Sequence, residues 1–193
     1  MIRAVIFDYY SVFRPDYYES FVEKAKDLSV EESKMIQTEI NNYYLGLSDI
    51  FKLIDAIQIT FKTRSIPITQ LIIDHLSIPE SFIKLTKKLH EHFYKVCIAG
   101  NLGSQEIQYL NRFNEQTKQF DIIAGPLNYG ESLLSEAFFE SFLNELGEPP
   151  HNCLLISGHS EFIKFCKNIE METYNYDNFN KLNKDILKIL EIS

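Results

Sequence analysis

The stretch that decides the fold is Ile2-Arg3-Ala4-Val5-Ile6-Phe7-Asp8-Tyr9-Tyr10-Ser11-Val12, at the start of the chain. An apolar run ends here in a single carboxylate, Asp8. Such a run is typical of a strand buried on both faces of a parallel sheet, and it places Asp8 at the carboxyl end of that strand. Ligands of open α/β sheets bind at this edge. A carboxylate there can attack phosphorus or carbon and form a covalent aspartyl intermediate.

The composition is that of a globular protein with an acidic balance. The 193 residues suffice for one compact domain, or for a core with a small insert. Hydrophobic residues make up 45% and charged residues 24% of the chain, which excludes the disordered and fibrous classes. The net charge of −8, with no block of Lys or Arg, excludes nucleic acid as a partner, because nucleic-acid surfaces carry a basic stripe.

Cysteine usage and hydropathy indicate the compartment. Cys97, Cys153 and Cys166 form no CxxC pair, and the first two lie in apolar runs. We therefore expect reduced core cysteines rather than disulfides or metal ligands. No apolar run is long enough to span a membrane, and the N-terminus has no secretory signal pattern. The sequence thus predicts a cytoplasmic protein without a membrane partner.

Strands and helices alternate over most of the chain. Short apolar runs predict strands at 2–7, 95–99, 120–124, 152–156 and 172–176. Apolar residues at helical spacing predict helices at 105–113, 135–146, 161–169 and 182–190. For the second of these helices, Ser135 is the expected N-cap and Gly147 the expected stop. This alternation predicts an α/β protein with a doubly wound, Rossmann-like parallel sheet.

The segment from about residue 16 to residue 77 breaks the alternation. It contains helical patterns at 17–28, 30–45, 49–60 and 68–76 and no convincing strand. We therefore predict a core formed by residues 1–15 and 78–193, with residues 16–77 inserted as an all-helical cap. A cap over the carboxyl edge of the sheet would exclude water and select substrates. The alternative is a helical decoration that only stabilises the core.

A strand ending in Asp, a helical insert and an α/β remainder together resemble the haloacid dehalogenase (HAD) superfamily. The stretch Tyr43-Tyr44-Leu45-Gly46-Leu47-Ser48-Asp49-Ile50-Phe51 is similar to a helix–Gly–helix turn common in the helical caps of that superfamily. The resemblance covers nearly the whole chain. It implies a HAD-like fold and, for most members, Mg²⁺-dependent phosphatase chemistry through an aspartyl-phosphate.

The first family motif is an apolar strand followed by Asp-x-Asp-x-Thr/Val. The resemblance assigns Asp8 to the nucleophile, Val12 to the last position and Tyr10 to the position of the second Asp, the acid/base. The dehalogenase branch itself carries Tyr there, so Tyr10 removes the usual general acid without excluding chemistry at Asp8. The alternative role of Asp8 is a turn cap that bonds nearby amides.

The second and third motifs supply a hydroxyl and a lysine that bind the phosphoryl group. In this chain Gly100 replaces the hydroxyl residue and Asn101 remains, so the amides of both could form a small anion nest. Gly100 could instead simply form the turn after the strand. Leu133 stands at the lysine position, and no Lys or Arg lies between Lys118 and Lys164. An apolar residue cannot balance the repulsion between a carboxylate and a phosphate dianion.

The fourth motif supplies the acids that hold Mg²⁺. Here Gly158 is followed by His159 in place of the leading Asp, and imidazole is a poor ligand for Mg²⁺. Asp8 and Glu161 are the acids left for a metal, although the position of Glu161 in a first helical turn is typical of a surface residue. Asp8 with His159 would suit a transition metal. The sequence therefore predicts no cofactor, with Mg²⁺ as the alternative.

These departures favour a pseudoenzyme that keeps the fold and binds a small molecule or protein partner at its cleft and cap. The alternative is an active hydrolase with Asp8 as covalent nucleophile, either dehalogenase-like or a phosphatase. Arg14 could supply positive charge to such a site, or it could be a surface residue at the cap hinge. Tyr17 and Asn42 of the cap could replace missing groups. A third possibility is an interaction module, with the tyrosine pairs 9/10, 17/18 and 43/44 as its surface.

Overall fold

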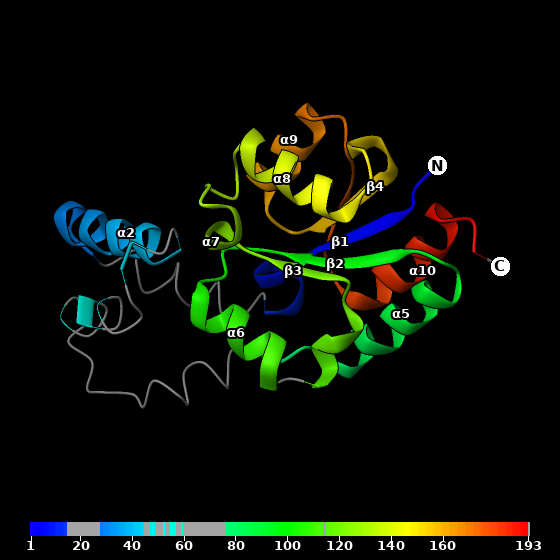
Figure 1. Ribbon diagram of the computed structural model, residues 1–193, viewed down its shortest axis with the longest axis horizontal. Helices are drawn as coiled ribbons and strands as arrows, with labels where there is room; N and C mark the ends of the chain where they lie inside the picture. The colour runs from blue at the N-terminus through cyan, green and yellow to red at the C-terminus, as the bar shows by residue number, and fades with distance from the viewer. Residues whose placement is uncertain are drawn as a thin grey trace.

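A five-stranded parallel sheet forms the centre of the protein (Figure 1). The computed structural model describes residues 1–14, 28–44, 47–48, 52, 55–56, 59, 76–113 and 115–192. The strand order is β3-β2-β1-β4-β5. The strands are β1 (Ala4–Asp8), β2 (Lys95–Ala99), β3 (Ile122–Ala124), β4 (Cys153–Ser157) and β5 (Glu172–Asn175). This order is that of a doubly wound sheet, which confirms the predicted fold class and all five predicted strands.

Helices cover both faces of the sheet (Figure 1). On one face lie α5 (Glu80–Glu91), α6 (Ser104–Phe113) and α10 (Phe179–Ile189), and on the other lie α8 (Glu136–Leu146) and α9 (Ser160–Asn168). The side chains of β1 alternate between the two layers. Val5 and Phe7 enter the core under the first group, whereas Ala4 and Ile6 enter the core under the second. Because all four are fully buried, β1 is the axis on which both cores are built.

Helix α8 begins and ends at the predicted residues. The Ser135 hydroxyl accepts a hydrogen bond from the Phe138 amide at 3.1 Å, and the helix stops at Gly147, which has a φ of 72°. Its apolar side faces the sheet, where the stacked rings of Phe138 and Phe142 lie 6.1 Å apart. The local signals and the burial pattern therefore specify the same helix.

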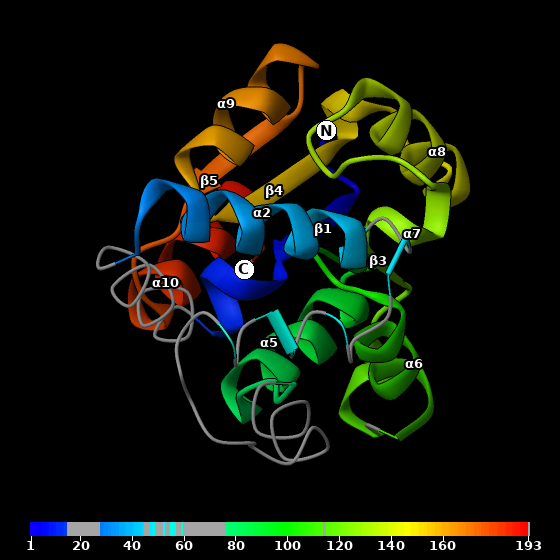
Figure 2. The same cartoon turned by 90° about the vertical axis from the view of Figure 1, so that its left-hand side faces the viewer.

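Helix α2 (Val30–Tyr44) confirms the helix predicted at 30–45. Ser29 and Glu32 form a capping box at its start, since the Glu32 amide donates to the Ser29 hydroxyl and the Ser29 amide donates to the Glu32 carboxylate. Figures 1 and 2 together show that α2 lies beyond the carboxyl ends of the strands and crosses in front of them. The helices predicted at 17–28, 49–60 and 68–76 fall largely outside the described residues, so the boundaries of the cap stay a prediction.

Several elements were not predicted from the sequence. Helix α5 is the longest of them, and its buried residues Phe82, Leu85 and Leu89 have ordinary helical spacing. The short elements are the π-helix η1 (Tyr9–Phe13), the 3₁₀ turns η2 (Glu115–Gln119) and η3 (Pro150–Asn152), and the one-turn helix α7 (Pro126–Tyr129).

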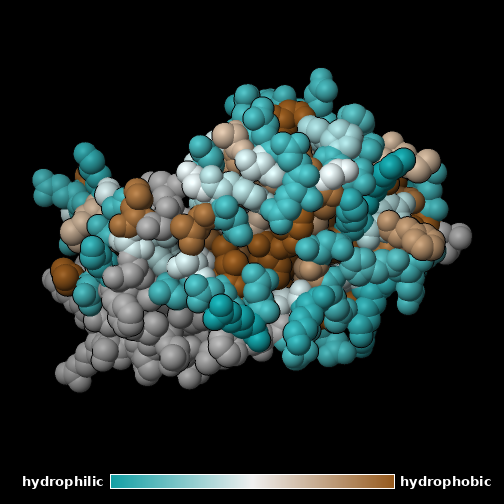
Figure 3. All heavy atoms as spheres, in the orientation of Figure 1, coloured by the Kyte–Doolittle hydropathy of each residue, from teal (hydrophilic) through white to brown (hydrophobic). Residues whose placement is uncertain are grey.

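Three further observations concern the cysteines, the surface and the length of the helices. Cys97, Cys153 and Cys166 are free and buried, as predicted, and burial raises the pKa of the Cys153 thiol to about 12. Figure 3 shows hydrophobic atoms at the surface where the edge strand β3 lies, between the two helical layers. Among the described residues, no helix has the length and apolar character needed to cross a membrane.

The α8 layer should dominate the stability of the core. Phe142 is fully buried, so we expect Phe142→Ala to lower the free energy of unfolding by about 3 to 5 kcal/mol, through lost transfer energy and a cavity. The matched control is Phe93→Ala, since Phe93 is 94% exposed, and its effect should stay within about 0.5 kcal/mol. Urea unfolding followed by circular dichroism measures both. Equal effects of the two substitutions would contradict this packing.

Candidate active site

Asp8 lies at the topological switch point of the sheet. Strand β1 has β2 on one side and β4 on the other, and Phe7 pairs with Ile156 of β4. Asp8 and Ser157 are therefore the last residues of two neighbouring strands, at the edge where ligands of this fold class bind. Asp8 is 6% exposed, so its carboxyl group must find its hydrogen bonds within the protein.

Two serine hydroxyls bind the same oxygen of Asp8. Ser157 Oγ donates to Asp8 Oδ2 at 2.7 Å, and Ser11 Oγ donates to the same atom at 2.5 Å. Ser11 reaches back to Asp8 because the π-helix η1 begins directly after β1. The two hydroxyl oxygens lie 3.2 Å apart, so Ser11, Ser157 and Asp8 Oδ2 form one compact group.

Backbone amides support both hydroxyls. The Gly158 amide donates to Ser11 Oγ at 2.8 Å, and the His159 amide donates to Ser157 Oγ at 2.9 Å. Both amides belong to the turn that leads from β4 into α9, whose N-cap is His159. Each chain of hydrogen bonds thus runs from a backbone amide through a serine hydroxyl to the Asp8 carboxylate, and such chains polarise their members.

The pKa of Asp8 is raised, because burial disfavours the charged carboxylate. The hydrogen bonds from Ser11 and Ser157 oppose this effect and lower the pKa, as do the electrostatic interaction with His159 and the backbone amide of Tyr10. The net direction shows that desolvation outweighs the groups that favour ionisation.

Tyr9 and Tyr10 pack in the core rather than forming an exposed interaction surface. Tyr9 is fully buried, and Tyr10 is half-buried against the same core cluster. Their rings meet edge to face at 5.1 Å. The backbone carbonyl of Tyr10 accepts a hydrogen bond from the Arg14 amide at 3.0 Å, which closes η1. The prediction that tyrosine pairs form an interaction surface is therefore wrong for residues 9 and 10. Residues 17 and 18 lie outside the described part of the chain.

Gly100 is a position of close approach. A Cβ atom at residue 100 would lie 2.9 Å from Tyr9 Cβ, a separation too short for two carbon atoms. The Gly100 amide donates to the Ala124 carbonyl at 3.1 Å, so the anion nest expected at Gly100 and Asn101 is wrong for Gly100. Asn101 is exposed at the same edge.

Among the described residues, the positions expected to supply a positive charge do not bring one to Asp8. Leu133 is 6% exposed and packs in the core under α8 and α9. Arg14 donates from Nη1 to the Ser77 hydroxyl at 2.7 Å, where the chain leaves and re-enters the predicted core. Asn42 accepts two amides at its backbone carbonyl, and Tyr17 lies outside the described residues.

The donors that the described residues bring to this edge do not by themselves fit Mg²⁺. The ion needs several hard oxygen ligands in octahedral array. Asp8 Oδ2 accepts two hydroxyls, His159 offers an imidazole, and Glu161 is exposed in the first turn of α9. In the described ranges, no three His, Cys, Asp or Glu side chains gather as a metal site would require. In the same ranges, Asp8 and His159 have no third His, Cys, Asp or Glu side chain with which to form a transition-metal site.

The structure thus brings Asp8 and Tyr10 to one edge with Gly100, Asn101 and His159, and it adds Ser11 and Ser157. Both serines were missed as site residues. Ser157 carries a usable signal, since it is the last residue of a buried strand and precedes a glycine. Ser11 carries none, because its contact depends on the π-helix.

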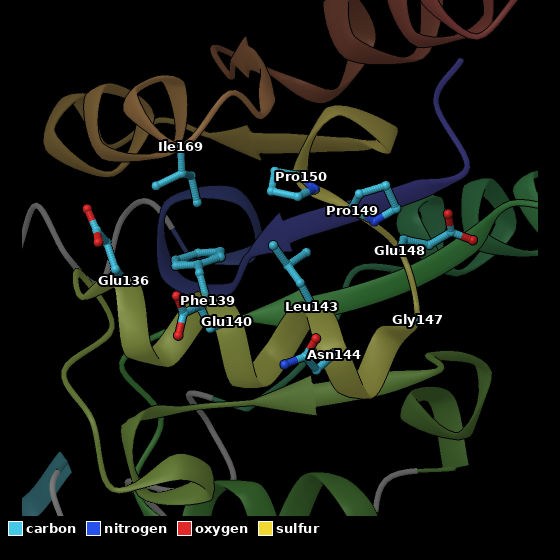
Figure 4. A pocket seen from close by; sticks show the side chains of 10 residues that line it. All are labelled: Glu136, Phe139, Glu140, Leu143, Asn144, Gly147, Glu148, Pro149, Pro150 and Ile169. Carbon is cyan, nitrogen blue, oxygen red and sulfur yellow. The ribbon is translucent and has the colours of Figure 1, made fainter.

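One hollow lies elsewhere, along α8 and the segment that follows it. It has a volume of about 570 Å³ and contains none of the predicted site residues. Figure 4 shows Phe139, Leu143 and Ile169 at this hollow, with Glu136, Glu140 and Glu148 among the other labelled side chains. A second open hollow lies at residues 87–91 and 118–121.

Adding one methyl group at residue 100 should damage the site. We expect Gly100→Ala to lower the free energy of unfolding by about 1 to 3 kcal/mol, because Tyr9 cannot move without disturbing the core. Gly158→Ala is the matched control, since a Cβ there meets its nearest atoms at 3.4 Å. Chemical denaturation of both variants measures the difference. A Gly158→Ala variant less stable than Gly100→Ala would refute the assignment.

The pKa of Asp8 makes stability depend on pH. Because the folded-state pKa lies above the ordinary 3.8, the contribution of the protonated carboxyl is fully present below that pH and is lost as the pH rises through the folded-state pKa. Asp8→Asn cannot ionise and keeps an acceptor oxygen. The stability of this variant relative to wild type should therefore rise between about pH 4 and pH 7.5, in urea unfolding. A flat or falling difference would show that the carboxylate is not destabilised.

No protein-family model and no curated protein sequence matches the chain. Solved structures do match it. A structure described as that of a predicted HAD-like family hydrolase from Porphyromonas gingivalis has a TM-score of 0.71 and 16% identity, covering 100% of both chains. A HAD family enzyme from Bacteroides thetaiotaomicron has a TM-score of 0.71 and 15% identity, covering 96% of this chain and 98% of that one.

The dehalogenase branch is also represented. L-2-haloacid dehalogenase from Xanthobacter autotrophicus, solved with chloropropionic acid covalently bound, has a TM-score of 0.63 and 15% identity, covering 97% of this chain and 83% of its own. At such low identity these matches establish architecture alone. Together with the sheet order and the position of Asp8, they show that this chain has the HAD-like fold.

Proposed function

We propose that this protein is a pseudoenzyme of the HAD-like fold, in which Asp8 is a structural carboxyl group and not a nucleophile. The observation that supports this most is the double hydrogen bond from Ser11 and Ser157 to Asp8 Oδ2. The carboxyl group is satisfied by the protein itself, and burial shifts it towards its neutral form. A protonated carboxyl is a poor nucleophile.

Among the described residues, the surroundings of Asp8 also lack the groups that stabilise a phosphoryl transition state. A transferring phosphoryl group needs cations and fixed donors where charge develops, and removing one such donor costs about 3 kcal/mol. In this chain Leu133 is a core residue, Gly100 has no room for a side chain, and His159 stands in place of an acid. Solved structures of the Bacteroides enzyme are described as complexes with magnesium and inorganic phosphate. We propose that this chain lost that chemistry and kept the architecture.

The role that remains is binding. We propose that residues 16–77 form a cap on a core of residues 1–15 and 78–193, and that a small molecule or protein partner binds at the cleft and cap. Asn101 and His159 support this proposal, since both present polar groups at the carboxyl edge of the sheet.

One observation favours a second candidate, a metal-independent dehalogenase. Both serine hydroxyls bind Oδ2, which leaves Oδ1 outside that pair of hydrogen bonds. In this reaction Asp8 Oδ1 would attack the carbon that bears the halogen, forming an ester as the halide leaves with the bonding electrons. Water would then hydrolyse the ester, giving the hydroxy acid, a proton and free Asp8 carboxylate. The absence of Lys at Leu133 weighs against this candidate.

Activity assays separate these functions. We expect no release of phosphate from p-nitrophenyl phosphate, and no release of chloride from L-2-chloropropionate, above the level of Asp8→Asn, with or without Mg²⁺. The reason is that Leu133 stands at the position where a lysine is expected to assist both reactions. Circular dichroism verifies that the variant is folded.

Release of phosphate and release of chloride would lead to different conclusions. Phosphate release that requires Mg²⁺ and disappears in Asp8→Asn would overturn the pseudoenzyme and establish a phosphatase. Chloride release that does not require Mg²⁺ and disappears in the variant would establish the dehalogenase.

A further inference from the structure

The last turn of α2 contacts the core at one aromatic side chain. Tyr43 is 1% exposed, and its hydroxyl donates a hydrogen bond to the carboxylate of Glu106 in the first turn of α6. These residues are 63 positions apart in the chain. The contact therefore joins the helix that lies beyond the carboxyl ends of the strands to the helix that follows β2 (Figures 1 and 2).

Gly103 provides the space for the Tyr43 ring. A Cβ atom at residue 103 would overlap Cζ, Cε1 and the hydroxyl oxygen of Tyr43. Gly103 lies in the short loop that starts with Gly100 and Asn101, at the edge occupied by Asp8. The ring thus fits against the loop that borders the candidate site, and it fits only because residue 103 has no side chain.

Glu106 depends on this contact. Burial raises the pKa of its carboxyl, while the Tyr43 hydroxyl and the backbone amides of Gly103 and Glu106 lower it. Without Tyr43, this half-buried carboxyl group would lose a hydrogen-bond donor, which is costly. The hydrogen bond is therefore part of what holds the two helices together, in addition to the buried ring.

A second bond holds the chain at the base of the predicted cap. Arg14 Nη1 donates to the Ser77 hydroxyl at 2.7 Å, so the outgoing and returning segments are joined beside the core. Together with Tyr43, this bond gives two separate attachments, one at the base and one on α2.

We infer that Tyr43 is a latch that fastens α2 to the Gly100–Gly103 loop and keeps the Asp8 edge covered. Asp8 is 6% exposed with α2 in this position. The inference rests on the contacts of Tyr43 and does not depend on whether Asp8 reacts. In this protein, α2 is then a fastened cover whose opening requires the Tyr43 contact to break.

Two substitutions break the latch in different ways. Tyr43→Phe removes the hydroxyl that binds Glu106, and Gly103→Ala adds a methyl group where the ring lies. The matched control is Tyr129→Phe, which removes a tyrosine–glutamate hydrogen bond of 2.6 Å to Glu145, between α7 and α8. Circular dichroism verifies that each variant is folded, so Tyr43→Phe suffices if Gly103→Ala does not fold.

The measurement is the rate at which a water-soluble carbodiimide and glycine ethyl ester modify Asp8, followed by mass spectrometry. Asp8 is the only side-chain carboxyl within residues 1–14, so peptides from that stretch report on it alone. We expect Tyr43→Phe and Gly103→Ala to raise this rate about tenfold, equivalent to about 1.4 kcal/mol of latch free energy. Hydrogen exchange of residues 100–106 should accelerate with it, whereas Tyr129→Phe should change neither rate.

Unchanged labelling of Asp8 in the folded latch variants would overturn the inference, as would an equal acceleration in Tyr129→Phe. These labelling rates do not involve turnover. Failure of the latch and failure of the pseudoenzyme proposal are therefore distinguishable, because the second is measured by phosphate and chloride release.

Discussion

The structure depends on how the carboxyl of Asp8 is satisfied at the end of a strand that is buried on both faces. Ala4 to Phe7 are fully buried between the two helical layers, so Asp8 emerges from the core with almost no access to water. An unsatisfied carboxyl there would cost several kcal/mol, roughly the whole margin of stability of a small domain. The π-helix after β1 and the end of β4 each bring a hydroxyl donor to this carboxyl, and amides of the turn into α9 donate to those two hydroxyls.

The groups that satisfy the Asp8 carboxyl in the fold differ from the groups that catalysis at Asp8 would need. Hydroxyl and amide donors hold a carboxyl whether or not it ever reacts, and Ser11 and Ser157 do this for Asp8. Catalysis on a phosphate or a haloacid needs more, namely opposite charge and room for a substrate. At two positions where the resemblance leads one to expect a lysine and a hydroxyl residue, the chain has a buried leucine, Leu133, and a glycine close to Tyr9, Gly100. Such an edge is what the proposed pseudoenzyme requires, since its donors satisfy Asp8 without supplying charge for a reaction.

The sequence predicted the sheet well because its signals are local. The run before Asp8 and the strand at 95–99 need only composition to be recognised, and Ser135 with Gly147 specifies both ends of α8. The missed helix α5 had an ordinary signal in Phe82, Leu85 and Leu89. The site was harder, because it is assembled from contacts between distant residues. Ser157 lies 149 positions from Asp8, and Tyr43 lies 63 positions from Glu106. No spacing in the sequence encodes the closeness of Tyr9 to Gly100 or of Tyr43 to Gly103.

The hydrogen bond between Arg14 and Ser77 has a consequence for how the sequence of such a protein can change during evolution. Because the two side chains meet at 2.7 Å, the chain departs from the core and comes back at neighbouring points. The entropy of closing a loop grows only slowly with its length, so segments of very different size can be exchanged between such points at little cost to the sheet. Insertions succeed where the ends of the interrupted chain stay adjacent. This junction is therefore a place where we expect the architecture to tolerate gain or loss of sequence, while β1 and its neighbours keep their register.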